Sequence, residues 1–505
     1  MTSANLIHAL YDGRDPQGPA LKFPDGRVIT TCELREDIAR YAAALAALGV
    51  SCGDRVSFKL EKAPEVLVLA HACLQLGAVL HPLNITYTDE ETVFLLKDAE
   101  PRLFVCGEAE RHRLASLSLD IAAIETLGEG GTGTLAARAA AATRLASVAP
   151  VSRDAPAAIL YTSGTTGKPK GAQITHGNLV ESARALASVW RLGPSDTLLH
   201  ALPVYHAHGL LTAINTLLIA GGSILFLPGF DPREVAAAFP SASVMMGVPT
   251  HYARLLREPG FAEAARVSRA LLISGSAPLP QELSDRFGRE TGQTIIERYG
   301  STETAIVTAI PAGCTDRSGW VGWPLPGVEI RVADDAAARA ALSSVGTLET
   351  RGHNVFAGYW KRPDADRESF TDDGWFITGD IAEIDATGCV RLLGRSKDLI
   401  ISGGLNVYPK EVETVLDALP GIAESAVFGV PHPDFGEAVV AAVVLAADAD
   451  FDERALVASS RGRLAAYKSP KRLIPVAEIP KNRMGKVLKS DLRATYRSLF
   501  ADASA

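Results

Sequence analysis

Short apolar runs that end in loops of small and polar residues recur along the first three hundred residues of this chain. The runs 157–160, 198–202, 244–246 and 271–273 each lead into a loop rich in glycine, serine, threonine, proline or histidine, and one more run leads into the loop 297–304. Apolar runs of this length are typical of buried strands. Because the carboxyl ends of parallel strands meet at one edge of a sheet, the pattern predicts an α/β fold whose five loops line one crevice.

The segments around this region repeat the alternation of helix and strand. Apolar residues recur at helical spacing over residues 32–48, and Gly49 follows where a helix would end. The same reasoning predicts strands at 56–60 and 78–83 and helices at 64–76 and 178–189. The alanine-rich stretch 136–147 predicts an exposed helix. The apolar stretch 210–227 predicts a buried helix, a Gly-Gly turn and a strand at 224–227.

The chain is expected to form more than one domain, because 505 residues exceed what one hydrophobic core usually supports. Beyond residue 320 the pattern predicts short strands at 327–332, 345–351 and 389–393. A separate α+β unit follows, with a helix at 412–419 and strands at 424–430 and 438–445. We place the boundary at residues 395–398. Residues 1–395 are then a large α/β domain with two mixed or parallel sheets and a β-rich subdomain, and residues 396–505 are a small mobile domain.

Composition excludes several classes of protein. The net charge of −8 gives no general attraction to nucleic acid, so an anionic ligand must meet a local cluster of cations. Six cysteines lie far apart without a C-x-x-C pair, which favours buried thiols in a reducing compartment over disulfides or zinc. The first residues lack the basic start of a signal peptide, and the stretch 210–227 is broken by Asn215, Gly221 and Gly222. We therefore expect a cytoplasmic protein without an integral membrane segment.

The stretch from Tyr161 to Gly171, YTSGTTGKPKG, combines hydroxyl residues, glycines and two lysines directly after an apolar strand. Backbone N–H groups, hydroxyls and a cation presented by such a loop bind phosphate. It is not a Walker A loop, because Gly167 and Lys168 follow Gly164 too closely and precede Pro169. A phosphate cradle and an ordinary polar turn both fit these residues on their own.

Seven ordered motifs then resemble the acyl-activating, AMP-forming ligases, a superfamily that includes acyl-CoA synthetases, aryl-CoA ligases, luciferases and peptide-synthetase adenylation domains. The motifs are YTSGTTGKPKG, YHAHG, SGSAPL, ERYGSTET, GWFITGD, GRSKD and PKNRMGKVLK. The resemblance runs from about residue 29 to residue 492. More narrowly, HALPVYHAHGL, GVPT, ISGSAPL and IIERYG look like malonyl-CoA synthetases. The resemblance implies that residues 1–395 bind ATP and the acid, and that residues 396–505 carry the adenylation lysine and the CoA face.

The resemblance implies a reaction in which ATP and a carboxylate give an acyl-adenylate and pyrophosphate, after which the thiol of coenzyme A displaces AMP. The matching ATP-binding positions are Thr162, Ser163, Gly164, Thr165, Thr166, Gly167, Lys170, Ser276, Ala277, Pro278, Glu297, Tyr299, Gly300, Ser301, Thr302, Asp380 and Arg395. Lys170 matches a phosphate-binding lysine and Thr302 the hydroxyl beside the α-phosphate. Glu303, with Thr166, matches the Mg²⁺ site, and Mg²⁺ suits a site of few carboxylates and many phosphate oxygens.

Several of these residues also have plainer interpretations. Glu303 could be an ordinary acid at a helix start, and Asp380 could be a turn former after Gly379. Lys486, in the PKNRMGK segment, matches the lysine that the small domain inserts in the first half-reaction, but a solvated surface lysine is the simpler alternative. The resemblance makes Lys397 the hinge candidate, and rotation about it would bring Ser402, Gly403 and Gly404 to the cleft for thiolation.

Two arginines bear on which acid is activated. Arg298 precedes the Tyr-Gly of the magnesium motif, and Arg254 lies in GVPTHYARLL. A guanidinium group is expensive to bury without an anion, whereas the second carboxylate of malonate would pair with it. Alternatively, Arg298 forms an ion pair with Glu297 or Glu303 and touches no substrate.

Other predicted substrate positions surround the same pocket. By the same resemblance, Gly275 matches the adenine wall and His206 matches a gate between the acid and CoA tunnels, whereas His208 could equally be a packed core histidine. Malonyl-CoA synthetases carry Met where this chain has Ser301 and often Thr where it has Ala207. Both differences remove volume, so the pocket accepts a 2-substituted malonate such as methylmalonate, or other residues fill the space.

We therefore expect a malonate:CoA ligase that uses ATP, Mg²⁺ and coenzyme A. A CoA ligase for an aryl or medium-chain monocarboxylate is one alternative. A degenerate nucleotide-binding regulator is another, although it would be expected to lose Lys170, Glu303, Asp380 or Lys486, which are all present. A carrier-protein thiol in place of CoA, and a lysine acetyltransferase acting on Lys486, are further possible partners; nucleic acid is not expected.

Overall fold

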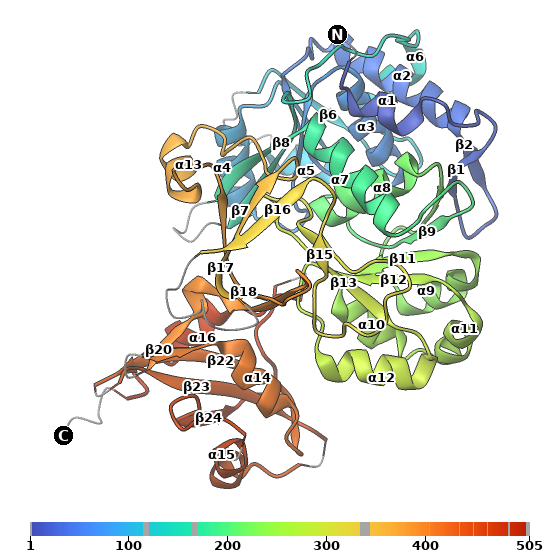
Figure 1. Cartoon of the computed structure of the whole chain (residues 1–505). Coiled ribbons are helices and arrows are strands. Elements are labelled where there is room, and N and C mark those ends of the chain that lie inside the picture. The colour runs from blue at the N-terminus through green and yellow to red at the C-terminus, as the bar shows by residue number, and fades with distance from the viewer. Residues whose placement is uncertain are drawn as a thin grey trace.

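Four β-sheets organise the part of the chain that is described (Figure 1). The structure is a computed structural model that describes residues 3–114, 121–163, 169–333, 344–402, 405–433, 435–447, 449–461, 463–482 and 485–500. Two large sheets and a smaller antiparallel sheet form the N-terminal part, and the fourth sheet forms the C-terminal part, which lies to one side of the others (Figure 1). This arrangement confirms a large N-terminal domain with a small C-terminal one.

The first large sheet has the strand order β6-β5-β3-β4-β7-β8. Its strands are β3 Arg55–Lys59, β4 Val79–Pro82, β5 Leu103–Cys106, β6 Ala123–Thr126, β7 Pro156–Ser163 and β8 Pro169–Thr175. The associated helices are α2 Thr31–Ala47, α3 Pro64–Gln75, α4 Asp89–Ala99, α5 Glu108–Leu114 and α6 Thr134–Ala141. All neighbours pair in parallel except β7 and β8, which are antiparallel and place Thr162 opposite Lys170. The predicted phosphate loop therefore joins two paired strands.

The second large sheet has the order β15-β14-β13-β12-β11-β9-β10-β1-β2. Its strands are β1 Pro19–Lys22, β2 Val28–Thr30, β9 Thr197–His200, β10 Ser223–Phe226, β11 Val244–Gly247, β12 Leu271–Ser274, β13 Ile295–Tyr299, β14 Thr308–Ala309 and β15 Trp323–Pro324. Strands β10, β9, β11, β12 and β13 are parallel neighbours. The predicted gathering of the loops after β9, β11, β12 and β13 at one edge is therefore confirmed.

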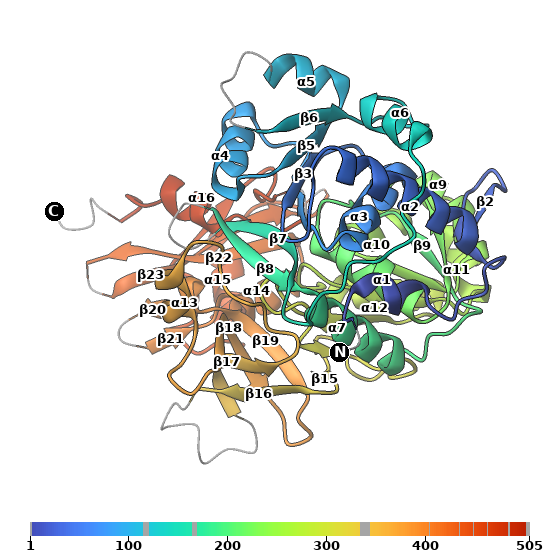
Figure 2. The same ribbon diagram turned by 90° about the horizontal axis from the view of Figure 1, so that it is seen from above.

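Helices of this region are α1 Leu6–Tyr11, α7 His176–Val189, α8 Ile214–Ile219, α9 Pro232–Ala238, α10 Pro249–Leu255, α11 Phe261–Val267 and α12 Gln281–Thr291. A π-helical turn, His208–Ala213, precedes α8. Gly209 allows this turn to approach the preceding loop, because a Cβ there would lie 2.0 Å from the carbonyl oxygen of Pro203. Figure 2 shows α7 and the nearby α1 from above.

The two remaining sheets are smaller. The antiparallel sheet consists of β16 Val328–Val332, β17 Ser344–Gly352, β18 Phe376–Ile384 and β19 Val390–Arg395, with α13 Pro363–Ser369 beside it. The C-terminal sheet consists of β20 Ile400–Ser402, β21 Leu405–Val407, β22 Ile422–His432, β23 Gly436–Leu445 and β24 Arg472–Pro475, with α14 Pro409–Asp417, α15 Glu453–Arg461 and α16 Lys489–Thr495. The predicted change to β-rich segments and then to an α+β unit is confirmed.

The prediction of an exposed helix over residues 136–147 is wrong in length, although side chains such as Ala137 and Ala140 are exposed as expected. Helix α6 ends at Ala141, and its Leu135 and Ala139 are buried. The backbone that follows is bonded to α3: Gln75 Nε2 donates to the carbonyl oxygens of Leu145 (2.7 Å) and Ser147 (3.2 Å). Tertiary hydrogen bonds here outweigh the helix propensity of the alanine-rich sequence.

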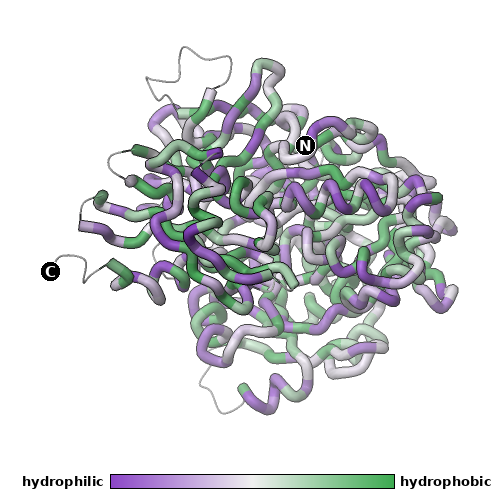
Figure 3. The backbone as a smooth tube through the Cα atoms, turned by 90° about the horizontal axis from the view of Figure 1, so that it is seen from below, coloured by the Kyte–Doolittle hydropathy of each residue, from purple (hydrophilic) through white to green (hydrophobic). Residues whose placement is uncertain are grey.

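The hydrophobic core consists of several clusters of buried apolar side chains. Figure 3 shows that hydrophobic and hydrophilic residues alternate along the backbone, as in amphipathic elements. All six cysteines are free, as expected; Cys73, Cys106 and Cys389 are buried, whereas Cys52 is exposed and so departs from the predicted pattern. Among the described residues, no helix combines the length and apolar character that a membrane crossing requires.

Candidate active site

The end of β7 meets the loop after β13, although the two strands belong to different sheets. Thr162 Oγ1 donates a hydrogen bond to Glu303 Oε1 at 3.0 Å, and the Tyr359 hydroxyl donates to the same oxygen at 3.1 Å. Within the described residues, Glu303 Oε2 has no hydrogen-bond partner, so it is free to accept a further ligand. The structure thus brings two predicted ATP-site residues together around one carboxylate.

Tyr359 also contacts Lys170, which lies with its Nζ 5.2 Å from the centre of the tyrosine ring. A cation over an aromatic face is attracted by the ring. The hydroxyl of this ring bonds Glu303, so Tyr359 links the predicted phosphate-binding lysine to the predicted magnesium ligand. Sequence reasoning missed Tyr359, because the segment between β17 and α13 carried none of the analysed motifs.

The loop after β13 owes its tight shape to Gly300, where a Cβ would lie 1.8 Å from the carbonyl oxygen of Ala305. Ser301 is held inside this loop, because its backbone N–H bonds Thr304 Oγ1 at 3.0 Å and its own hydroxyl lies 3.1 Å from the same oxygen. Thr302 is left at the loop surface, where it lines both of the cavities described below.

Asp380, on β18, lies against the end of β13. The Tyr299 hydroxyl donates to Asp380 Oδ2 at 2.5 Å, and Arg395 Nε lies 2.8 Å from Oδ1. Burial raises the pKa of Asp380, and the positive charge of Arg395 opposes that rise. Each carboxylate oxygen can accept a second hydrogen bond, so the pair of oxygens remains able to receive two hydroxyl groups.

The loop after β12 carries Ser276, Ala277 and Pro278. Ser276 adopts a left-handed backbone conformation with φ of +68°, which is uncommon outside glycine. Nearby, Glu297 Oε2 accepts a hydrogen bond from the Leu279 N–H at 3.2 Å. Burial raises the pKa of Glu297 to about 7, although the charge of Lys410 opposes the rise. Lys410 belongs to α14, so the C-terminal part reaches this side of the site.

Arg298 is the most unusual charged residue of the site. Its side chain is buried and lies so close to Gly275 that a Cβ there would meet its Cζ at 2.5 Å. No ion pair or hydrogen bond joins its guanidinium group to any residue in the described part of the chain, and its Nε has no partner. Burial lowers its pKa to about 10. The alternative in which Arg298 pairs with Glu297 or Glu303 is therefore wrong.

His208 lies within electrostatic reach of Arg298. His208 Nδ1 lies 3.1 Å from Ser276 Oγ, and the charge of Arg298 contributes, after burial, to holding the pKa of His208 far below its usual value. Burial lowers the pKa of His206 to about 4, and Nε2 of His206 and of His208 has no hydrogen-bond partner in the described part of the chain. Arg254, in contrast, is exposed on α10.

The C-terminal part presents Lys486 to the site. Desolvation, followed by the charges of Arg395 and Lys397, lowers the pKa of Lys486, while Asp380 raises it. The turn before it contacts α10, because a Cβ on Gly485 would lie 3.3 Å from Thr250 Cγ2. Lys397 is exposed in the 3-10 turn Ser396–Asp398, and Ser402 is buried in β20.

Several predicted positions of the phosphate loop and of the predicted CoA face are not described by the structure. Gly164, Thr165, Thr166, Gly167, Gly403 and Gly404 lie outside the described residues, and of Ser163 only the backbone position in β7 is described. Within the residues that are described, no group of three or more His, Cys, Asp and Glu side chains is arranged to hold a metal ion.

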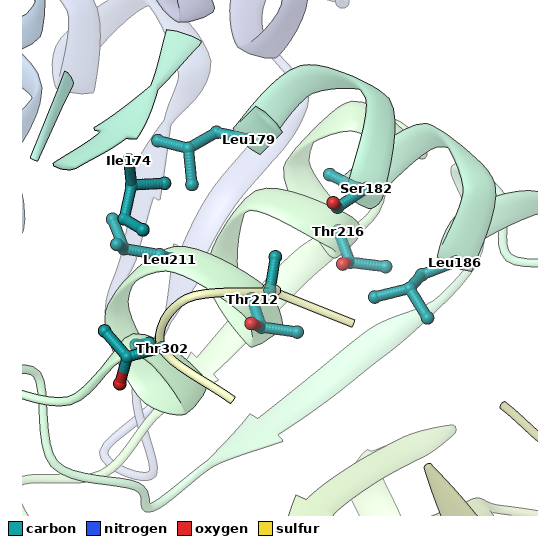
Figure 4. Close-up of a pocket in the computed structure, with 11 residues that line it drawn as sticks. Ile174, Leu179, Ser182, Leu186, Leu211, Thr212, Thr216 and Thr302 are labelled. Atoms are coloured by element: carbon teal, nitrogen blue, oxygen red, sulfur yellow. The ribbon is translucent and has the colours of Figure 1, made fainter. Parts of the chain in front are cut away.

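Two cavities meet at Ala207 and Thr302. One is polar and lies between the two large sheets; its other walls are Pro82, Leu83, Asn84, Tyr87, Leu160, Tyr161, Tyr205 and His206. The second is mostly apolar and extends between α7 and α8; its other walls are Ile174, Leu179, Ser182, Ala183, Leu186, Leu211, Thr212, Thr216 and Ala305 (Figure 4). Sequence reasoning identified His206, Ala207 and Thr302 but missed the remaining walls, which come from elements far apart in the sequence.

Comparison with known proteins agrees with the geometry. Residues 11–360 match the family of AMP-binding enzymes, and residues 411–486 match the C-terminal domain of AMP-binding enzymes. The ATP-bound structure of MatB from Rhodopseudomonas palustris superposes with a TM-score of 0.94 at 44% identity, covering 99% of this chain and 100% of that one.

Relatives of known name act on different acids. The feruloyl-CoA synthase of an Amycolatopsis species is 34% identical, covering 93% of this chain and 94% of the relative. The sulfoacetate–CoA ligase of Cupriavidus necator is 35% identical, covering 97% of each chain. The mitochondrial malonate–CoA ligase of Mus musculus is 35% identical, covering 87% of this chain and 81% of the relative. The chain therefore belongs to the AMP-binding enzyme family and is an ATP-dependent, AMP-forming acyl-CoA synthetase.

Proposed function

We propose that this enzyme joins malonate, or a 2-substituted malonate such as methylmalonate, to coenzyme A through an acyl-adenylate, with release of AMP and pyrophosphate. The observation that carries the proposal is Arg298, a buried guanidinium group without a carboxylate partner among the described residues. A buried unpaired charge is strongly unfavourable. The second carboxylate of a malonate would supply the missing partner.

The size of this effect is enough to select the substrate. A hydrogen bond between charged groups contributes roughly 1.5–3 kcal/mol, which is about tenfold to a hundredfold in preference over a monocarboxylate. The named relatives that act on malonate and sulfoacetate support the proposal, because each of these acids carries a second anionic group. Arg254 is exposed and is a weaker candidate for the same role.

For the first half-reaction, we assign charge neutralisation and in-line positioning to the groups around Glu303. Glu303 Oε2, which has no hydrogen-bond partner among the described residues, fits a Mg²⁺ ion, which takes few protein carboxylates and many phosphate oxygens. When bound, Mg²⁺ would neutralise phosphate charge. Lys170 and Thr162 would hold the β- and γ-phosphates, and Thr302 would donate to the α-phosphate.

The remaining nucleotide contacts follow from the geometry of the other loops. Asp380 would accept the two ribose hydroxyls with Arg395 beside it, and Glu297 would accept from the adenine amino group. Lys486 lies within electrostatic reach of Asp380 and would meet the acid carboxylate and the α-phosphate. The polar cavity behind His206 offers the thiol a path to Thr302.

For thiolation, we propose that residues 396–505 rotate as a domain about Lys397, which would exchange Lys486 for Ser402, Gly403 and Gly404 at the cleft. The exposed position of Lys397 between β19 and β20 suits a hinge, because few packed side chains oppose a change of its backbone.

The test is pyrophosphate release with malonate, methylmalonate, ethylmalonate, succinate, acetate and benzoate. We expect malonate or methylmalonate to have the highest kcat/KM, and Arg298→Ala to lower that value tenfold to a hundredfold while leaving acetate unchanged. Arg254→Ala serves as the matched control on an exposed arginine. Malonate activity that survives Arg298→Ala would show the dicarboxylate assignment to be wrong.

One observation favours a second candidate, a ligase for an aryl or medium-chain monocarboxylate. The cavity between α7 and α8 is lined mainly by apolar side chains, and one named relative is a feruloyl-CoA synthase. This candidate predicts that benzoate or hexanoate is activated at least as fast as malonate, and that the Arg298→Ala variant keeps that activity.

A further inference from the structure

The cavity between α7 and α8 contains two hydroxyl groups that no side chain or backbone group in the described part of the chain satisfies. Ser182 on α7 and Thr216 on α8 extend into it from facing helices (Figure 4). Ser182 is 6% exposed and Thr216 is 0% exposed, and neither hydroxyl has a hydrogen-bond partner among the residues that the structure describes. Buried hydroxyls are nearly always hydrogen-bonded, so this pair indicates an occupant.

The chemistry of the walls defines that occupant. Near Thr302 the cavity is walled by Ile174, Leu179 and Leu211, whereas the two unsatisfied hydroxyls lie farther along the helices (Figure 4). A group that fits has an apolar stem and a hydrogen-bonding atom beyond it. A purely apolar group would leave both hydroxyls unpaired, which is costly.

The cavity opens beside the reaction centre. Ala207 and Thr302 are walls both of this cavity and of the polar cavity proposed for the thiol. A larger side chain at position 207 would reduce the opening. An acid whose carboxylate lies at Thr302 would therefore have this opening between α7 and α8 beside it.

We propose that this cavity binds the 2-substituent of a substituted malonate, that the substituent carries a hydrogen-bonding oxygen beyond an apolar stem, and that Ser182 and Thr216 determine this specificity. The inference rests on the proposed dicarboxylate activity. It goes beyond that activity, because it names the class of substituent and two residues that read it. These residues touch neither the nucleotide site nor the reacting carboxylate.

The experiment compares two acids of nearly equal shape, 2-(2-methoxyethyl)malonate and 2-butylmalonate, which differ by one ether oxygen in place of a methylene. We would measure kcat/KM for pyrophosphate release with the unmodified enzyme and with Ser182→Ala, Thr216→Val and the double variant. Ser188→Ala, at an exposed position of α7, is the matched control. The ratio of the two kcat/KM values is taken within one enzyme, so partial loss of folded protein cancels.

We expect the ratio of ether to butyl acid to fall about tenfold in the double variant, because hydroxyl donors to the ether oxygen are lost, and to stay unchanged in Ser188→Ala. A change of less than twofold would overturn the inference, and would leave the hydroxyls as ligands of water. Rejection of both acids by an enzyme that activates malonate would also overturn it, while the dicarboxylate proposal would stand. Failure with malonate itself would remove both.

Discussion

At the scale of single residues, Arg298 shows a conflict between stability and binding. The folded protein buries this cation without a partner in the described part of the chain, an arrangement that lowers stability in the absence of substrate. Gly275 provides the room, because any side chain there would collide with the guanidinium group. Residues that bind substrate charge commonly carry such a cost, since the partner arrives only with the substrate.

The conflict predicts that Arg298→Met stabilises the ligand-free enzyme. We expect the free energy of unfolding to rise by about 1–3 kcal/mol, because a flexible apolar side chain replaces an unpaired buried charge. Urea denaturation of both proteins without ligands measures the difference. Arg254→Met, on exposed α10, should change it by less than about 0.5 kcal/mol. A destabilised Arg298→Met variant would mean that the guanidinium group has a structural partner.

Glu303 gives a second prediction at this scale. Glu303→Gln keeps an acceptor for Thr162 and Tyr359 but removes the negative charge beside Oε2. We expect kcat for pyrophosphate release to fall about a hundredfold and the Mg²⁺ concentration for half-maximal rate to rise, because the protein then contributes no charge to the ion. A titration with MgCl₂ at fixed ATP measures both. Tyr359→Phe, which removes one donor to Glu303, should lower kcat only a fewfold. An unchanged Mg²⁺ requirement in Glu303→Gln would contradict the role of Glu303 as a Mg²⁺ ligand.

The residues of the site could be predicted to the extent that they lie in ordered motifs. Thr162 and Glu303 are 141 positions apart, and their motifs identified both before their contact was known. Tyr359 could not be found in this way, because its role arises from a contact between a loop and two other elements. The absence of an ion pair between Arg298 and Glu297 or Glu303 could not be predicted either. Both acids are close to Arg298 in the sequence, and only the fold shows that neither pairs with it.

At the scale of elements, α7 connects the phosphate-binding strands to the substrate cavity. Thr175 and Asn178 form a reciprocal N-cap at its start, and Asn178 Nδ2 also donates to the carbonyl oxygens of His353 (2.6 Å) and Val355 (2.9 Å). One buried side chain therefore fixes both the helix start and the loop that leads to Tyr359. Helix α7 was predicted two residues short, whereas this cross-link was not, because it joins segments 175 residues apart.

Asn178→Ala should loosen this cross-link. We expect a loss of about 2–3 kcal/mol in the free energy of unfolding, from two buried hydrogen bonds and part of a helix cap. The KM for ATP should rise as well, because Tyr359 and Glu303 are held by the released loop. Thermal unfolding and pyrophosphate release measure the two effects. Thr30→Ala, at the capping box of α2 far from the site, is the control that should lose about 1 kcal/mol and keep its KM.

At the scale of the whole molecule, the sequence predicted the classes of the sheets but not their strand order. Strands β1 and β2, from the first thirty residues, extend the second sheet beside β10, and the two strands of the phosphate-loop hairpin complete the first sheet. Local patterns define strands, whereas pairing between strands two hundred residues apart depends on tertiary packing. The boundary at residues 395–398 stays a prediction.

The whole molecule also encloses an unusual number of histidines. Burial is the largest cause that lowers the pKa of seven of them: His71, His81, His176, His200, His206, His208 and His251. The pKa falls to about 3 for His71 and to about 4 for His206. Such rings are neutral in the folded protein at neutral pH but take up a proton near pH 6.5 when the chain unfolds.

The enzyme should therefore lose stability steeply between pH 6.5 and pH 4. A pKa lowered in the folded state gives stability that is complete above the unfolded pKa and is lost as the pH falls toward the folded pKa. At pH 5 each buried histidine contributes a loss of about 2 kcal/mol, so the sum approaches the whole stability of a typical domain. Glu297 acts in the opposite direction, because its raised pKa favours the folded state at low pH. Urea midpoints followed by tryptophan fluorescence from pH 8 to pH 4.5 measure the loss. In His71→Gln, the loss of unfolding free energy between pH 8 and pH 5 should be smaller by about 2 kcal/mol. His112→Gln, at an exposed position, should leave that loss unchanged. An unfolding free energy that stays level down to pH 5 would show that these rings gain protons in the folded enzyme.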